Sequence, residues 1–335
     1  MTWMSLGSLA LPHQLQRHGL GLRNDLARLA LEMTTGESAT PAARLKGDLQ
    51  PLAALEARAQ RVGSLREVTQ QAMTHASVAQ TALARVAQSG GETSARMLAV
   101  STAGIDQAAL TAAGQAARAV FADITGALGA DVAGRALFSG SASDRSPLAA
   151  PDAMLSALSA AVAGATSADE VATIVTAAFM DPGGLFETSF YQGGPAVDGA
   201  ILDSGQAVPA LPTVADPALR RSLAGLATAA LVADDSLTLS GGQRQALART
   251  AALTLSGAEA SVTALQSDLG QVEGRLETAL TRLTGERDAL VLSREALIGV
   301  DPYEAATRLE MTQTRLELIY TVTARTSRLS LAGYL

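Results

Sequence analysis

The pattern of apolar and polar positions divides the chain into helical ends and a middle of different texture. Apolar side chains recur in steps of three and four from 15 to 33 and from 52 to 86, and this spacing predicts two amphipathic helices. The stretch between these two helices holds four helix-breaking residues, Gly36, Pro41, Gly47 and Pro51. Gly90-Gly91 predicts a further break, after which a third helical run extends over 106–138.

The most regular apolar pattern lies in the second half of the chain. From Leu255 to Leu283 the steps of three and four continue without a slip, and the register persists more loosely to Val300. This predicts a long coiled-coil-like helix from Gln243 to Val300. At 1.5 Å per residue it would extend roughly 85 Å, so the molecule is expected to be elongated.

A last helix is predicted to begin directly after this one. Asp301 can serve as its N-cap, Pro302 suits the first helical position, and Glu304 follows three residues after the cap. Its apolar stripe starts at Ala305 and runs toward the C-terminus.

The middle of the chain, about 139–238, shows short elements separated by turns. Ser167 with Glu170 forms a capping box, and Asp216-Pro217 is a second helix start, so two short helices are predicted. The glycine-rich stretch 185–212 between them predicts two or three strands. This middle is interpreted as a small α+β domain inserted between helices.

The fold class predicted is therefore mainly α. Both chain ends form an elongated antiparallel helical stem, from which the inserted domain projects. The expected divisions are a terminal helix over 1–40, stem helices over 41–140, the inserted domain over 141–238, a long stem helix over 239–300 and a terminal helix over 301–335 that pairs with the first.

Composition excludes several kinds of function. Aromatic residues are only 3% of the chain although 48% of residues are hydrophobic, which suits helices packed through small side chains. The net charge of −7 gives no basic excess for binding nucleic acid. There is no cysteine, so disulfides and cysteine-based metal sites are excluded. The start has no signal-peptide pattern and no apolar stretch reaches a membrane-spanning length, so we expect a soluble chain without a cleavable signal.

Candidate catalytic groups are few. His13 and His18 lie five positions apart, which does not place them on one helix face, and His75 is distant in sequence. The acidic pairs, such as Asp234-Asp235, precede helices and are interpreted as turn and cap residues. We therefore predict no catalytic site, metal or cofactor.

The stretch LTLSGGQRQALARTAALTL contains the letters LSGGQ, which form the signature motif of ATP-binding cassette transporters. That motif acts on a nucleotide held by a P-loop, which needs a lysine after a glycine. Lys46 is the only lysine of the chain, and Gly47-Asp48 follows it, so no P-loop can be built. The letters are interpreted as a helix start, with Ser240 and Gln243 at capping-box spacing.

Three segments of the chain carry motifs of a known family. The C-terminal stretch DPYEAATRLEMTQTRLELIYTVTARTSRLSLAGYL, through Ala306, Leu309, Leu316, Tyr320, Ser330, Leu331, Tyr334 and Leu335, resembles the closing helix of the flagellin superfamily. The resemblance is strongest to the branch whose members join the flagellar hook to the filament. LARLALEMTTGESAT is similar to the family's L..L...LSTG element through Leu26, Leu29, Thr35 and Gly36, and DVAGRALFSGSASD to its GR.LFAG segment through Gly134, Arg135, Leu137, Phe138 and Gly140. The Asp-Asp-Pro-Ala-like continuation of flagellin is replaced by ARLKGDLQPLAALEA, which suits the junction branch better than filament flagellin.

The resemblance implies a non-catalytic structural subunit that assembles through its terminal helices. Implied partners are other copies in a ring, a neighbouring hook-associated protein, flagellin, and an export chaperone on the C-terminal helix. Neither nucleic acid nor a membrane is expected as a partner. The implied location is the hook–filament junction, reached by flagellar type III export. Filament flagellin and a cytoplasmic coiled-coil signalling or adaptor protein remain as alternatives.

The residues expected to carry this role form two sets. The terminal-helix interface is expected to comprise Leu15, Leu22, Leu26, Leu29, Met33, Leu309, Leu316, Ile319, Tyr320, Leu329, Leu331, Tyr334 and Leu335. The stem core is expected to comprise Leu55, Val62, Leu83, Val86, Phe138, Val262, Leu265, Leu269, Val272, Leu276 and Leu283.

Overall fold

The computed structural model describes residues 7–197 and 211–332. The chain divides into two compact units, which are described separately below. The terminal unit consists of Met1–Ser64 and Leu283–Leu335, and the second unit is Leu65–Arg282. Two long helices, α3 (Gln50–Thr102) and α8 (Gly241–Ile298), each contribute to both units.

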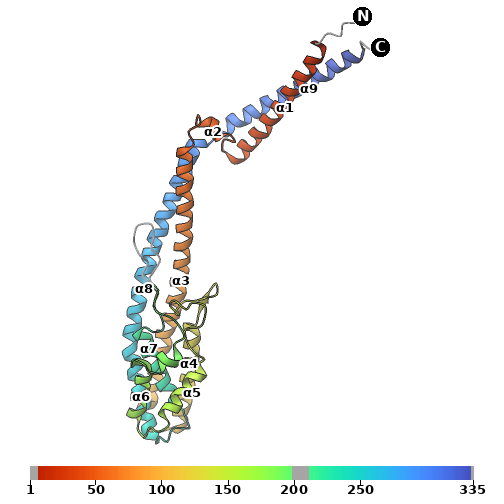
Figure 1. Cartoon of the computed structure of the whole chain (residues 1–335). Coiled ribbons are helices and arrows are strands. Elements are labelled where there is room, and N and C mark those ends of the chain that lie inside the picture. The colour runs from red at the N-terminus through yellow and green to blue at the C-terminus, as the bar shows by residue number, and fades with distance from the viewer. Residues whose placement is uncertain (1–6, 198–210, 333–335) are drawn as a thin grey trace. The chain divides into compact units, whose positions relative to one another are not determined.

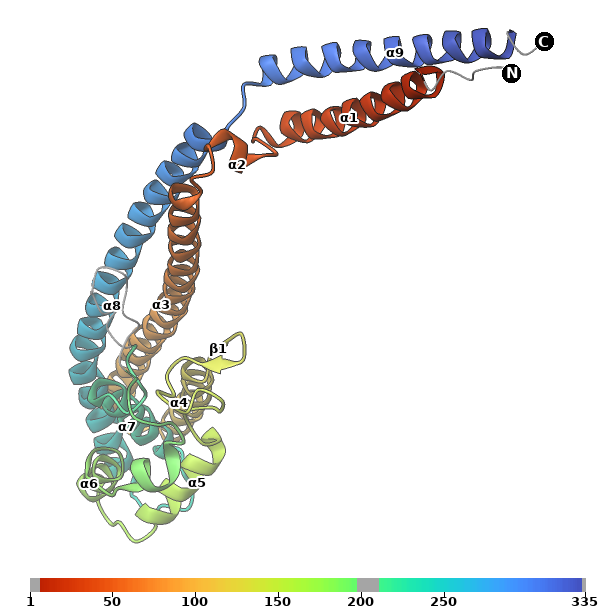
Figure 2. The same cartoon turned by 45° about the horizontal axis from the view of Figure 1, so that its top comes forward.

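The terminal unit is built around two helices from opposite ends of the sequence. Helices α1 (Gly7–Thr35) and α9 (Pro302–Ala332) pack side by side and antiparallel, as both views show (Figures 1 and 2). The short helix α2 (Pro41–Arg44) lies between α1 and α3 in the sequence. The predicted helical pairing of the two chain ends is thus observed.

The predicted boundary between the last two helices is confirmed. Helix α8 spans Gly241–Ile298, within two residues of the prediction at each end, and α9 begins at Pro302. The Asp301 carboxylate accepts the backbone N–H of Tyr303 at 2.8 Å, which satisfies one of the amides that a helix start leaves unpaired.

The break predicted at Gly90-Gly91 is wrong. Helix α3 runs through both glycines to Thr102, and Gly90 is buried. Nearby, the Ser94 hydroxyl donates to the Ala252 carbonyl of α8 at 2.8 Å. Each glycine costs about 1 kcal/mol of helix propensity, and packing against a neighbouring helix outweighs that cost here.

The third helical run is also shorter than predicted. Helix α4 spans Gln107–Leu128 and does not reach Phe138. It is followed by a two-stranded antiparallel hairpin, β1 (Asp131–Val132) and β2 (Arg135–Ala136). The two turn residues, Ala133 and Gly134, have φ of 53° and 77°. Such positive φ values at both central positions suit the tight turns of hairpins.

The middle segment is more helical than predicted. Besides the expected α6 (Ala168–Met180) and α7 (Pro217–Leu231), it contains α5 (Pro151–Val162) and a π-helical turn, η1 (Phe186–Phe190). The strands predicted for 185–212 are absent from its described part, 185–197 and 211–212, where Tyr191 forms only an isolated bridge with Leu148. Residues 198–210 lie outside the described ranges. The aromatic side chains of η1 are buried against Phe179, with ring centroids 6.1 and 5.7 Å apart, and this packing favours a helical turn over strands.

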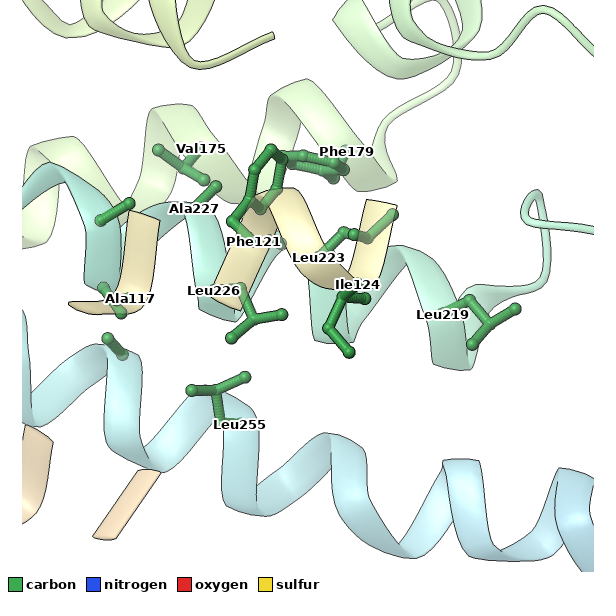
Figure 3. Packing of buried hydrophobic residues seen from close by; sticks show 14 of the residues in the cluster. Ala117, Phe121, Ile124, Val175, Phe179, Leu219, Leu223, Leu226, Ala227 and Leu255 are labelled. Carbon is green, nitrogen blue, oxygen red and sulfur yellow. The ribbon is translucent and has the colours of Figure 1, made fainter. Parts of the chain in front are cut away.

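The core of the second unit lies between α4, α6, α7 and α8. Figure 3 shows Phe121 of α4 and Phe179 of α6 meeting above α7, with Leu255 of α8 on the opposite side of α7. Nearly every residue of α7 is buried. Gly225 permits the close approach of α8, because an added Cβ would lie 2.8 Å from the Leu255 side chain.

Candidate functional site: the terminal helix pair

The inner face of the α1–α9 pair is formed by the apolar stripe that the sequence predicts. Leu29 is 4% exposed, and Leu15, Leu22 and Leu26 are partly buried. On α9, Leu309, Leu316 and Ile319 are partly buried as well. Two helices alone cannot enclose a stripe completely, so much of this apolar area stays partly accessible within one chain.

Not every predicted interface residue lies on this inner face. Met33 is 48% exposed, and Tyr320 is 46% exposed although its hydroxyl accepts from Arg23 of α1. Leu329 and Leu331 lie within α9, and Tyr334 and Leu335 lie outside the described residues.

A van der Waals contact and a polar pair join the two helices near the middle of α1. Gly19 is buried, and an added Cβ would lie 3.9 Å from Ile319. One turn further along, Arg23 donates from Nε to the Tyr320 hydroxyl at 2.6 Å. The Arg23 guanidinium also lies 5.5 Å from the centre of the Tyr320 ring. Ile319 and Tyr320, which are adjacent on α9, therefore contact Gly19 and Arg23, which lie one turn apart on α1.

The pair also carries a second apolar stripe that faces outward and that the sequence reading missed. On α9, Met311, Leu318 and Val322 are 50%, 58% and 44% exposed. Their spacings of seven and four place them on one helix face. On α1, Leu20 and Leu31 are 55% and 52% exposed, and eleven positions are close to three full turns. The signal was in the sequence, as a second periodicity beside the inner stripe.

The loops next to the pair are joined by backbone hydrogen bonds. We call the two segments 36–38 and 298–300 the clasp. Ser38 N–H donates to the Ile298 carbonyl at 2.7 Å, and Val300 N–H donates to the Gly36 carbonyl at 2.8 Å. Gly36 has a φ of 70°, and its N–H donates to the Glu32 carbonyl, so it ends α1 in the manner of a left-handed C-cap. The Thr35-Gly36 motif therefore has a local structural role.

Charged side chains reinforce the clasp. Glu37 and Arg294 form an ion pair, and Arg44 donates from Nε to the Leu297 carbonyl at 3.0 Å. Glu32 is only 5% exposed, and its carboxylate accepts the Ala39 N–H at 3.1 Å. Arg28 lies 3.9 Å from the same carboxylate. A buried carboxylate needs such partners, so these contacts hold the end of α1 against the segment that follows it.

The second group of family-like residues, 134–140, also has a structural setting. Leu137 and Phe138 are buried, and the Phe138 carbonyl accepts Val214 N–H at 3.1 Å. Gly140 has a φ of 58°, and an added Cβ would lie 2.5 Å from the Gly194 carbonyl oxygen. Gly134 and Arg135 form the hairpin described above, where Arg135 is exposed. These residues join the hairpin to the segments on either side of 198–210.

The residues predicted for the stem core are mostly buried in the units to which they belong. Leu55 and Leu265 are partly buried. The buried members are Val62, Leu83, Val86, Phe138, Val262, Leu269, Val272, Leu276 and Leu283. Within the second unit, Gln80 donates to the Gln266 carbonyl of α8 at 3.3 Å, and its own side-chain oxygen is buried without a partner.

Across the part of the chain that the structure describes, no group of three metal-binding side chains comes together. His13 and His18 are exposed. Burial, and then the positive charge of Arg135, lower the pKa of His75 below its usual 6.5. In residues 7–197 and 211–332, no helix combines the length and the apolar character needed to cross a membrane.

The LSGGQ letters begin a helix, as predicted, but the capping box is incomplete. Ser240 accepts the backbone N–H of Gln243 at 3.3 Å. The Gln243 side chain does not reach back to Ser240 and instead accepts the N–H of Ala168 at 2.8 Å. Lys46, the lysine that a P-loop would need, lies in the loop after α2 with a φ of 54°.

Comparison with known proteins adds one family match. Residues 254–335 match the family model described as the bacterial flagellin C-terminal helical region. This segment covers most of α8 and all of α9. No curated protein matches the chain. The C-terminal segment is thus similar to that of the flagellins, which supports a relationship to the flagellin superfamily and a role as a structural subunit of the flagellum.

Proposed function

We propose that this protein, whose C-terminal segment is similar to that of flagellin, is a non-catalytic flagellar subunit that joins the hook to the filament. The main support for this proposal is the outward apolar stripe of the terminal helix pair. Met311, Leu318 and Val322 stand half exposed on α9, beside an inner stripe that already packs against α1. A helix pair with apolar residues on both faces favours burial against further helices of the same kind.

The occupant of this outward stripe is a second copy of the chain or a related subunit with similar terminal helices. Burying the remaining exposed area of each of these side chains contributes about 1 kcal/mol. A single such contact gives weak association, but a ring or helical array repeats it on every subunit. The outward residues lie on both α1 and α9, which suits contacts repeated from copy to copy.

The junction role is supported by the sequence that follows Thr35-Gly36. In place of the Asp-Asp-Pro-Ala-like continuation of flagellin, the chain has residues 43–57, which form the end of α2, the loop after it and the start of α3. Filament flagellin is the second candidate, since the matching family model is that of flagellin. Growth of the purified protein into long filaments would favour flagellin, and short layers that stop growing would favour the junction role. In either case we propose that the protein leaves the cell by flagellar export with a chaperone on α9.

The test is a pair of charge-matched variants on α9. Leu318→Glu places a carboxylate on the outward stripe, and Gln313→Glu adds the same charge at an exposed polar position of the same helix. We expect Leu318→Glu to lose binding to isolated hooks, measured by co-sedimentation and electron microscopy, while Gln313→Glu binds like the wild type. Circular dichroism checks that both monomers keep wild-type helix content. Normal hook binding by folded Leu318→Glu would contradict the proposal.

A further inference from the structure

The first turn of α8 contacts the end of a neighbouring helix through a buried arginine. Arg244 is 6% exposed, and its guanidinium donates to three carbonyls in the segment after α7: Val232 at 2.6 Å, Asp234 at 2.8 Å and Leu237 at 3.0 Å. The last carbonyls of a helix have no partner within the helix. The planar guanidinium holds several donors in fixed directions, so one side chain reaches all three carbonyls.

The residue before it contacts a different helix. Gln243 accepts through Oε1 from the N–H of Ala168 at 2.8 Å. Ala168 is the first residue of α6, where backbone amides lack intrahelical partners. The local cap, Ser167, accepts the N–H of Glu170, so Gln243 supplies the acceptor for an amide that the local cap does not serve.

The turn held by Arg244 is in contact with α5 as well. Ser236 donates from its backbone N–H and its hydroxyl to the Asp234 carboxylate, at 2.9 and 2.7 Å. The Ser236 hydroxyl also lies 3.1 Å from the hydroxyl of Ser159 on α5. The first turn of α8 therefore contacts α6 and the segment after α7 directly, and it contacts α5 through that segment.

We infer that Gln243 and Arg244 are positioning residues that couple α5, α6 and α7 to the stem helix, so that these four elements open as one cooperative unit. Arg244 carries most of the coupling. Without its guanidinium, the carbonyls of Val232 and Leu237 lose this donor, and the Asp234 carbonyl keeps only the 3.4 Å bond from the Leu237 N–H. The turn that joins α7 to α8 and contacts α5 then loses its shape. This inference is independent of the proposed flagellar role, since it concerns only the second unit.

The main test compares two arginine variants of the full chain by hydrogen–deuterium exchange with mass spectrometry. Arg244→Met removes the donors and keeps a long apolar side chain, and Arg249→Met is the control at an exposed position of the same helix. We expect Arg244→Met to lower protection by at least ten-fold in peptides from α5, α6 and α7 alike. Arg249→Met should leave all of them within two-fold of the wild type. A loss confined to 232–244, or no loss, would overturn the inference.

A second pair of variants tests the coupling should Arg244→Met fail to fold. Gln243→Glu keeps an acceptor for the Ala168 amide, and Gln243→Leu removes it. We expect Gln243→Leu to lower protection several-fold in α6 and α7 together, and Gln243→Glu to stay within two-fold of the wild type. Equal behaviour of the two variants would show that the side-chain acceptor does not couple the helices.

Discussion

The two glycines at the start of α8 look equivalent in the sequence but have different surroundings in the fold. An added Cβ at Gly242 meets nothing within 4 Å, whereas at Gly241 it would lie 2.8 Å from Cγ2 of Ile105. Replacement by alanine therefore probes one position with open space and one with a close neighbour. From helix propensity alone, alanine is expected to stabilise the helix at both positions.

The expected magnitudes follow from helix propensity and from this contact. Glycine is less favourable than alanine by about 0.8–1 kcal/mol inside a helix, so Gly242→Ala should stabilise the first turn by up to about 1 kcal/mol. Gly241→Ala gains the same propensity, but Ile105 must move. Overpacking costs about 1–3 kcal/mol in a tight core and less here, because Ile105 is 66% exposed. We expect Gly241→Ala to be neutral or destabilising by up to about 1 kcal/mol.

Hydrogen exchange of the peptide 237–250 measures these differences as opening free energies. A double-mutant cycle with Ile105→Ala isolates the contact. In that background Gly241→Ala should stabilise nearly as much as Gly242→Ala does alone. Equal stabilisation by both single variants would refute the role of Ile105, and destabilisation by Gly242→Ala would refute a helical first turn at this position.

Three further predictions concern other sites. Gln80→Leu replaces a buried oxygen that has no partner and should raise the free energy of unfolding by about 1 kcal/mol in urea denaturation; a loss of similar size would contradict this. Gly36→Ala must adopt a φ of 70° and should weaken protection of the Ser38 and Val300 amides by about 1–2 kcal/mol. Its control, Gly21→Ala, lies within α1 with open space around it, and equal effects of the two would exclude a conformational cause. Burial raises the pKa of Asp234, but hydrogen bonds from Ser159 and Ser236 outweigh it and lower the pKa below 3.8. Its stabilising effect is therefore present above pH 3.8 and lost as the pH falls through the folded-state pKa, so the urea midpoint should fall less between pH 6 and pH 3 in Asp234→Asn than in the wild type; an equal fall would contradict this.

The parts of the fold that were predicted correctly are those with local signals. The cap at Asp301, the proline at 302 and the unbroken apolar register from Leu255 to Leu283 all act within one helix, and the boundaries of α8 and α9 follow from them. The starts of α6 and α7 were predicted for the same reason, since Ser167 and Asp216 cap their own helices.

The parts that were missed depend on contacts between distant residues. Nothing near Gly90 indicates that α8 will pack there and keep α3 helical. The clasp joins Gly36 to Val300, and Arg44 beside it donates to the Leu297 carbonyl. No local pattern in the sequence indicates such pairs. The capping-box spacing predicts that the Gln243 side chain bonds to Ser240. In the fold it accepts the N–H of Ala168 instead, which lies far away in the sequence. The outward stripe at Met311, Leu318 and Val322 is different, because its spacing was present in the sequence and only its exposure was unknown.

Immunogold labelling of isolated flagella with antibodies against this protein shows where the protein lies in the assembled organelle. We expect label confined to a short zone at the boundary between hook and filament. Label along the whole filament would assign the protein to filament flagellin, and flagella without label would contradict a flagellar role altogether.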